Sequence, residues 1–299
     1  MRSTLIATVL LLSLLACQSD SSEPELENIA ALEKDIEASP TADKIEELIG
    51  LYEQYIADHP DEVDTNSEML QKAAFVQYAG HRYASAIKHL KRAIREFYSS
   101  KKTPENALFL ASIISKEMNN PTVSNAAYYA YLQAFPNHAK VAFVRDSILT
   151  DSMDLHAEID SLRTRIYNDA TNKYDSEVSN NFIGTCEMHG LLLPEDPASP
   201  DLLYEAARTA GYIRSFPMAV YMYEWVYTRY PEYPKASQAL FMMAFTYDNE
   251  MGMADKAREL YGEFLQKYPS DDFADDAQVL LQNLGKSEEE VLKTLQQEQ

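Results

Sequence analysis

The sequence predicts an all-α fold: a solenoid of antiparallel helix pairs in which two arrays are joined by a middle with an odd number of helices. Three observations support this prediction. Only eight of the 299 residues are glycine, whereas Ala, Leu, Glu and Lys are common, which favours helices over strands. Apolar residues recur with helical spacing along most of the chain. Five segments repeat one pattern, and neighbouring copies lie 38 residues apart.

The repeated segments end at aligned residues and share three internal positions. Their terminal residues are Pro60, Tyr98 and Pro136 in one group and Pro231 and Pro269 in the other. The internal positions are spaced by four and then three residues, so they lie on one helical face. The first position is Leu48, Ala86, Ser124, Ala219 or Ala257; the second is Tyr52, Leu90, Tyr128, Tyr223 or Tyr261; the third is Tyr55, Ala93, Tyr131, Val226 or Phe264. We call this set the repeat face and expect it to be buried.

The pattern resembles helix B of a tetratricopeptide repeat, A-x3-F-x2-A-x4-P. The small residue lets two helices approach, the aromatic ring fills the space between them, and the proline ends the helix. Each preceding helix carries a small residue where that family has its packing glycine, at Ala74, Ser112, Ala207 and Ala244. Two departures stand out: the period is 38 residues instead of about 34, and the family's tryptophan is replaced by Leu or Phe.

The resemblance also implies a binding surface. In tetratricopeptide repeats the first helix of each pair lines a concave groove that holds a peptide. Aromatic side chains there would act as rigid anchors for an apolar or strand-like partner. The Lys and Asn of the family's carboxylate clamp are absent. Mapped onto this chain, the groove positions are Gln71, Phe75, Tyr78, Phe109, Tyr204, Arg208, Tyr212, Phe241 and Phe245.

The repeat frame divides the chain into an N-terminal array (29–138), a middle (139–198) and a C-terminal array with capping helices (199–299). Ser124 and Ala219 are 95 residues apart, which is two and a half periods. The middle is therefore expected to hold three helices, near 139–149, 153–170 and 174–192. It is either a hinge or a continuous stack with one unpaired helix. The capping helices are expected at 273–285 and 287–299.

The first residues predict a lipid anchor. Residues 1–16 combine Arg2 with an apolar run that is too short to cross a bilayer, as in a secretory signal peptide. Leu14 to Cys17 resembles the bacterial lipobox, which implies an acylated Cys17. Residues 17–28 are polar and acidic and are expected to be a disordered tether. By resemblance to other lipoproteins, Gln18 favours the outer membrane, and we expect the protein to face the periplasm.

Composition argues against several functions. Lys and Arg number 26 against 47 Asp and Glu, a net charge of −21, which argues against nucleic acid and against contact with the membrane other than through the lipid on Cys17. The six histidines show no metal-ligand spacing, and no phosphate loop or nucleophile motif is present, so we expect neither metal nor cofactor nor catalytic residue. Cys186 lies between apolar neighbours and is expected to be a buried, inert thiol.

These features together predict a non-enzymatic, lipid-anchored scaffold that binds other envelope proteins or peptides, with a resemblance to the repeat proteins of outer-membrane barrel assembly and of the Tol–Pal system. Two alternatives stay open. One is a surface-exposed ligand-binding or glycan-binding lipoprotein, and the other is an envelope hydrolase on a helical scaffold. The sequence leaves the partner and the oligomeric state undetermined.

Overall fold

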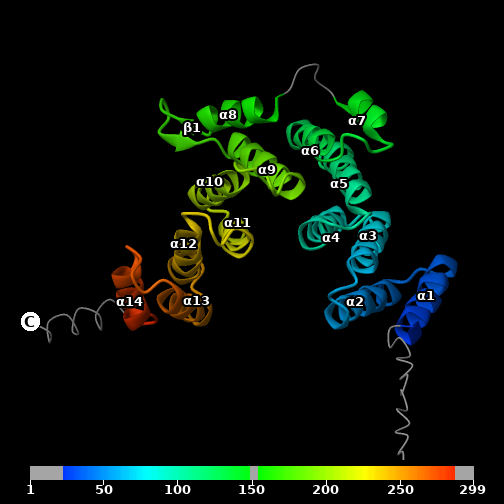
Figure 1. Cartoon of the computed structure of the whole chain (residues 1–299), viewed down its shortest axis with the longest axis horizontal. Coiled ribbons are helices and arrows are strands. Elements are labelled where there is room, and N and C mark those ends of the chain that lie inside the picture. Colours follow the sequence, from blue (N-terminus) through cyan, green and yellow to red (C-terminus); the bar gives the residue numbers. More distant parts are fainter. Residues whose placement is uncertain (1–22, 149–153, 287–299) are drawn as a thin grey trace, which may run out of the picture.

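The structure, a computed structural model, describes residues 23–148 and 154–286. The predicted signal peptide (1–16), the predicted lipidation site Cys17 and the last predicted helix (287–299) lie outside the described residues. Apart from one short hairpin, the regular elements of the described part are helices, which confirms the all-α solenoid. They follow an arch, with the N-terminal array on one side and the C-terminal array on the other (Figure 1).

Helix pairs build both arrays. The N-terminal array comprises α1 (Glu23–Ala38), α2 (Ala42–Asp58), α3 (Val63–Ala79), α4 (Tyr83–Glu96), α5 (Thr103–Lys116) and α6 (Pro121–Ala134). The C-terminal array comprises α10 (Ser199–Tyr212), α11 (Phe216–Arg229), α12 (Ala236–Asn249), α13 (Ala254–Lys267) and the added helix α14 (Ala274–Asn283). In Figure 1, α4 and α11 lie on the inner side of the arch, whereas α3 and α10 lie further out.

The repeat face is buried throughout, as predicted: the exposed fractions of its residues run from 0% to 6%. The prolines have the predicted role as well. Helices α6, α11 and α13 each end two residues before a proline, because a proline disfavours helical backbone in the residue before it. The residue between then closes the helix: Tyr230 N–H, for example, donates to the carbonyl of Val226 at 3.1 Å.

The described residues of the middle form three helices, α7 (Val141–Ser147), α8 (Leu155–Arg165) and α9 (Ser176–Leu192). Its odd number agrees with the phase break. Helix α9 packs against α6 on one side and α10 on the other, so the two arrays form a continuous stack with one unpaired helix between them. A glycine faces each neighbour: a Cβ on Gly184 would lie 2.7 Å from Val123 of α6, and one on Gly190 would lie 2.9 Å from Leu203 of α10.

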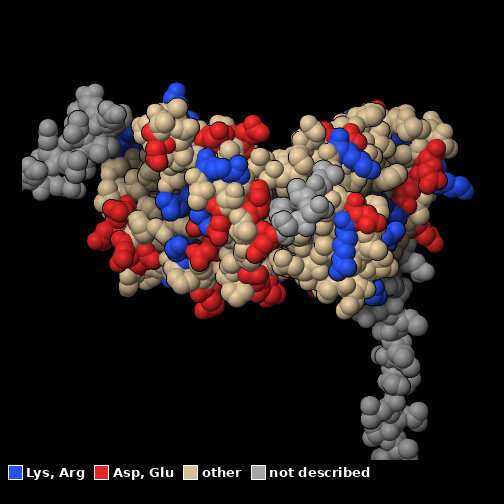
Figure 2. All heavy atoms as spheres, turned by 90° about the horizontal axis from the view of Figure 1, so that it is seen from above, with Lys and Arg blue, Asp and Glu red and all other residues tan. Residues whose placement is uncertain are grey.

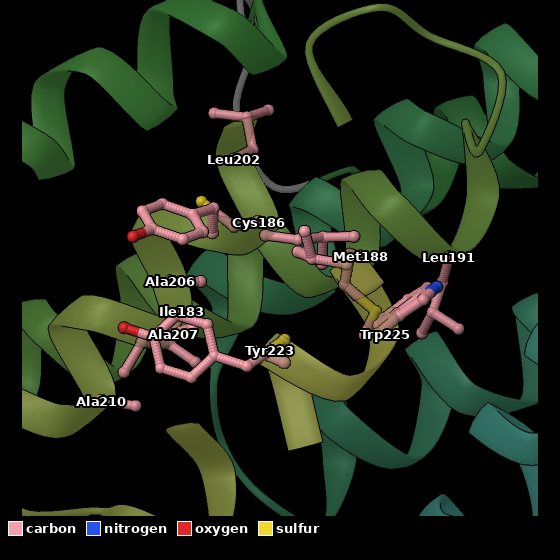
Figure 3. Packing of buried hydrophobic residues seen from close by; sticks show 14 of the residues in the cluster. Ile183, Cys186, Met188, Leu191, Leu202, Ala206, Ala207, Ala210, Tyr223 and Trp225 are labelled. Atoms are coloured by element: carbon pink, nitrogen blue, oxygen red, sulfur yellow. The ribbon is translucent and has the colours of Figure 1, made fainter. Parts of the chain in front are cut away.

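Side chains from α9, α10 and α11 meet in the core of this stack (Figure 3). Met188 and Trp225 point toward one another there, and Cys186 lies beside the small residues of α10. Met188 and Cys186 are fully buried and Trp225 is 2% exposed. The unpaired helix is therefore part of the main hydrophobic core, and this core is continuous from α3 to α14.

Two predicted boundaries are wrong. Helix α1 (Glu23–Ala38) includes residues 23–28 of the expected tether 17–28, and its Leu26 packs against the buried cluster that α1 shares with α2. Helix α8 ends at Arg165 instead of near residue 170. A hairpin of β1 (Tyr167–Asn168) and β2 (Lys173–Tyr174) follows, with Asn172 at a φ of +52°, which asparagine tolerates better than most residues.

None of the helices within the described ranges is both long enough and apolar enough to span a bilayer.

Candidate protein-binding groove

A groove opens in the N-terminal array, between its first three helices and α5. It has a volume of about 820 Å³ and is bounded by α1, α2, α3 and α5. Its floor and walls are mainly apolar and include Ile36, Ile45, Leu48, Phe75, Val76 and Phe109. A pocket of this size, lined by aliphatic and aromatic side chains, is typical of a binding site for an apolar ligand.

The groove exists because α1 and α2 do not close fully onto the rest of the array. Buried residues form two clusters, and the smaller one joins α1, α2, one side of α3 and the end of α4. The larger cluster starts at Ala74 on the other side of α3. Between them Phe75 is left 63% exposed, although a phenyl ring of this size normally gains free energy by burial.

Polar contacts fix the walls of the groove. Lys72 Nζ on α3 lies 2.9 Å from Glu33 Oε1 on α1, and the Tyr52 hydroxyl donates to the same oxygen at 2.6 Å. Burial and, after it, the hydrogen bond to Glu33 raise the pKa of Tyr52, so the phenol stays protonated and donates. Because Lys72 neutralises Glu33, the negative charge of the rim comes from the second carboxylate there, that of Glu37.

The predicted groove residues of the N-terminal array lie together. Gln71, Phe75 and Phe109 all line the groove. Gln71 Nε2 donates to Asn106 Oδ1 at 2.7 Å, which ties α3 to α5. Tyr78 lies beside them, with its ring centroid 5.5 Å from that of Phe109 and its hydroxyl donating to Glu117.

The predicted residues of the C-terminal array are arranged differently. Tyr204 and Phe241 are only 5% and 6% exposed, so we remove them from the candidate surface. The turn after each second helix places another ring over them: Tyr233 packs on Tyr204, and Phe273 stacks 4.8 Å from Phe241. Phe245 is half-buried against Phe241.

Arg208 and Tyr212 lie on the surface of α10 and contact each other. The Arg208 guanidinium donates to the Tyr212 hydroxyl at 2.7 Å. The Tyr212 ring, 47% exposed, stacks 4.8 Å from Tyr174 of the hairpin. These two residues support the hairpin, and they lie on a different helix from those that bound the groove.

Sequence reasoning missed the contribution of α1 and α2. The predicted groove positions include no residue of these two helices, yet Ile36 and Ile45 supply part of the apolar wall. Their signal was present as apolar residues at helical spacing with Leu32 and Leu48. The family resemblance places groove positions only on first helices that align with the repeat, so it does not predict these residues.

The surface charge is spread over both arrays. Figure 2 shows acidic side chains across the face seen there, with Lys and Arg placed among them instead of in one continuous basic area.

The thiol of Cys186 is fully buried, and burial raises its pKa, with Glu205 as a further cause. The thiolate needed by a nucleophile is therefore disfavoured.

The fold and the groove define a helical-repeat protein with a peptide-sized apolar groove. Residues 238–271, from α12 through the turn after α13, match the tetratricopeptide repeat family. A similar solved structure is the TPR2AB domain of yeast Sti1 in its complex with pHSP90, at 14% sequence identity and a TM-score of 0.33, covering 88% of this chain and 99% of that one. No curated protein matches the chain.

Proposed function

We propose that the protein is a non-enzymatic scaffold that binds segments of other proteins in the groove between α1, α2, α3 and α5. The exposed ring of Phe75 is the observation that carries this proposal. An aromatic ring left in a concave apolar site has free energy to gain from a partner's side chain. The tetratricopeptide match is consistent with a protein-binding role.

The occupant we propose is an extended or helical segment with apolar residues next to a Lys or Arg. Apolar side chains would fill the space over Phe75 and Val76. The neighbouring cation would face Glu37 on the rim, because Glu33 is already paired with Lys72. Charge of this kind mainly sets the orientation and the association rate, while the apolar contacts supply most of the affinity.

A random peptide library panned against the purified protein tests the proposal. We expect enrichment of peptides that combine apolar residues with Lys or Arg. Phe75→Ser should weaken them by about tenfold or more, because it removes the central anchor. Phe143→Ser is the matched control, since Phe143 is 60% exposed on α7, away from the groove. Peptides that bind both variants equally well would contradict the groove assignment.

The location proposed for this scaffold is the periplasmic face of the outer membrane, where it would serve envelope assembly through a lipid on Cys17. The support is the lipobox-like sequence ending at Cys17 together with Gln18. A Cys17→Ser chain should be released from the membrane fraction and should lose incorporation of a palmitate analogue. Protease treatment of intact cells should leave the unmodified protein whole. Its digestion would favour the surface-exposed alternative.

A further inference from the structure

The turns that connect one helix pair to the next have the same pattern of backbone hydrogen bonds, and the turn after α9 has this pattern too. We call each such turn a joint. Leu193 N–H donates to His189 O, and Asp196 N–H donates to Leu193 O. The same bonds at α11 run from Tyr230 to Val226 and from Tyr233 to Tyr230. Helix α9 is therefore equivalent to the second helices, although its offset from α11 is 37 residues instead of 38.

In this frame His189 takes the third position of the repeat face. The other helices place a tyrosine, alanine, valine or phenylalanine there. Where the residue is tyrosine, its hydroxyl reaches the side chain seven residues later: Tyr55 donates to Glu62 Oε2 at 2.7 Å, and Tyr131 pairs with His138 Nδ1 at 2.5 Å. At α9 the corresponding pair is His189 and Asp196.

This pair lacks the hydrogen bond found at the tyrosine joints. Ser199 Oγ donates to Leu193 O at 2.7 Å, so it accepts from His189 Nδ1 at 3.0 Å. The proton of the neutral ring is therefore on Nδ1, and Nε2 presents a lone pair. His189 Nε2 is buried without a hydrogen-bond partner, and it lies 3.8 Å from Asp196 Oδ2. Two acceptors thus face each other.

The imidazole of His156 lies beside these two acceptors. His156, the second residue of α8, has its ring centroid 5.2 Å from that of His189 in an edge-to-face arrangement. One ligand atom from each of His156, His189 and Asp196 lies within 4.8 Å of the others. The three residues come from α8, α9 and the turn before α10, so they are brought together only by the fold.

We propose that His156, His189 and Asp196 bind one divalent transition-metal ion of the Zn²⁺ class. Two imidazoles and a carboxylate suit Zn²⁺ and not Mg²⁺ or Ca²⁺, which prefer oxygen ligands. The Nδ1 hydrogen bond to Ser199 is the outer contact that orients a metal-binding histidine. Tetrahedral Zn²⁺ with bonds of about 2.0–2.1 Å places its ligand atoms about 3.3 Å apart, so the site closes by movements on the order of one ångström.

The ion would join α8 to the joint between α9 and α10. Helix α8 lies at the edge of the arch, outside the stack of pairs (Figure 1). A metal link there would fix the hairpin that follows it, and three protein ligands would leave a fourth position for water. This role is independent of the proposed groove, and it departs from the sequence-based expectation of no metal.

Metal titration of the purified full chain, first stripped with EDTA, tests the proposal. Zn²⁺ binding is followed by calorimetry, and Co²⁺ binding is followed by visible absorption. We expect one equivalent to bind and Zn²⁺ to raise the thermal midpoint. His156→Ala changes an exposed side chain and Asp196→Asn keeps the shape of the turn, so both should fold. Each should weaken binding by at least about tenfold.

His89→Ala is the control, because His89 lies on α4 and outside this cluster, and it should bind as tightly as the unmodified chain. The proposal is overturned if the unmodified chain binds no Zn²⁺. It is equally overturned if His156→Ala and Asp196→Asn bind as tightly as the control, since the ion would then sit elsewhere.

Discussion

Replacing Phe264 by alanine should remove one of the rings that hold α12 and α13 together. Phe264 occupies the third position of the repeat face on α13 and is fully buried. Its ring centroid lies 5.7 Å from that of Phe241 and 5.8 Å from that of Tyr268. Truncating a buried phenylalanine costs about 3–5 kcal/mol through lost transfer free energy and the cavity left behind.

Phe75→Ala supplies the matched comparison, since the chemical change is the same. Phe75 is 63% exposed, so about a third of its surface is buried. Full burial of such a side chain contributes up to about 3 kcal/mol, which gives an expected loss of about 1 kcal/mol. The difference between the two variants should therefore be at least about 2 kcal/mol in the free energy of unfolding.

Urea unfolding followed by circular dichroism at the helical band measures both values. Hydrogen exchange of the two variants would locate the effect, because the stability of a repeat array depends on neighbouring units. Phe264→Ala should speed exchange in α12 to α14 most strongly. Equal losses for the two variants, or an effect of Phe264→Ala confined to the N-terminal array, would refute the assigned repeat register.

Three further perturbations test the middle of the stack. Lys91→Met should lower the free energy of unfolding by about 3 kcal/mol, because the buried carboxylate of Glu187, which lies 2.6 Å from Lys91 Nζ, would lose its cation. Adding Glu187→Met should recover most of this loss in urea unfolding. A double variant that recovers nothing would contradict the explanation. Gly184→Ala should lower the free energy of unfolding by about 1–3 kcal/mol, because the new methyl group pushes α9 away from Val123. Gly50→Ala is the control: Gly50 has open space around it, so stability should stay equal or rise by up to about 1 kcal/mol. Equal effects of the two variants would argue against close packing of α9 on α6. In metal-free protein, burial lowers the pKa of His189 from 6.5 to about 4. Below pH 6.5 the unfolded chain therefore binds this proton before the folded chain does, and the free energy of unfolding should fall by about 2 kcal/mol from pH 6.5 to pH 5. His189→Gln should remove that part of the pH dependence.

The 38-residue frame was sufficient to predict which face of the second helices is buried. Positions such as Ala86 and Tyr261 combine a small or aromatic residue with a fixed distance to the helix end, and packing between pairs needs both. The repeat pattern does not identify α9 as a second helix, for two reasons. Its frame is shifted by one residue, and it carries Phe182, Cys186 and His189 where the pattern has a small residue, a large apolar one and an apolar one.

The candidate site was predicted only in part. Phe75 on α3 and Phe109 on α5 lie in the groove because both face the space that α1 and α2 leave open. Tyr204 and Phe241 are buried because Tyr233 and Phe273 close over them, and these rings come from turns whose course the helical periodicity does not specify. The cluster of His156, His189 and Asp196 depends on three separate elements, so sequence spacing could not reveal it.

The most direct test of the scaffold account is photo-crosslinking in living cells from an unnatural residue placed at position 75, with the same residue at position 143 as the control. Both positions hold an exposed phenylalanine, and only Phe75 lines the groove. The account predicts a discrete crosslinked protein at position 75 and not at position 143, with the attachment site in a segment that joins apolar residues to Lys or Arg. The same products from both positions, or none at position 75, would contradict it.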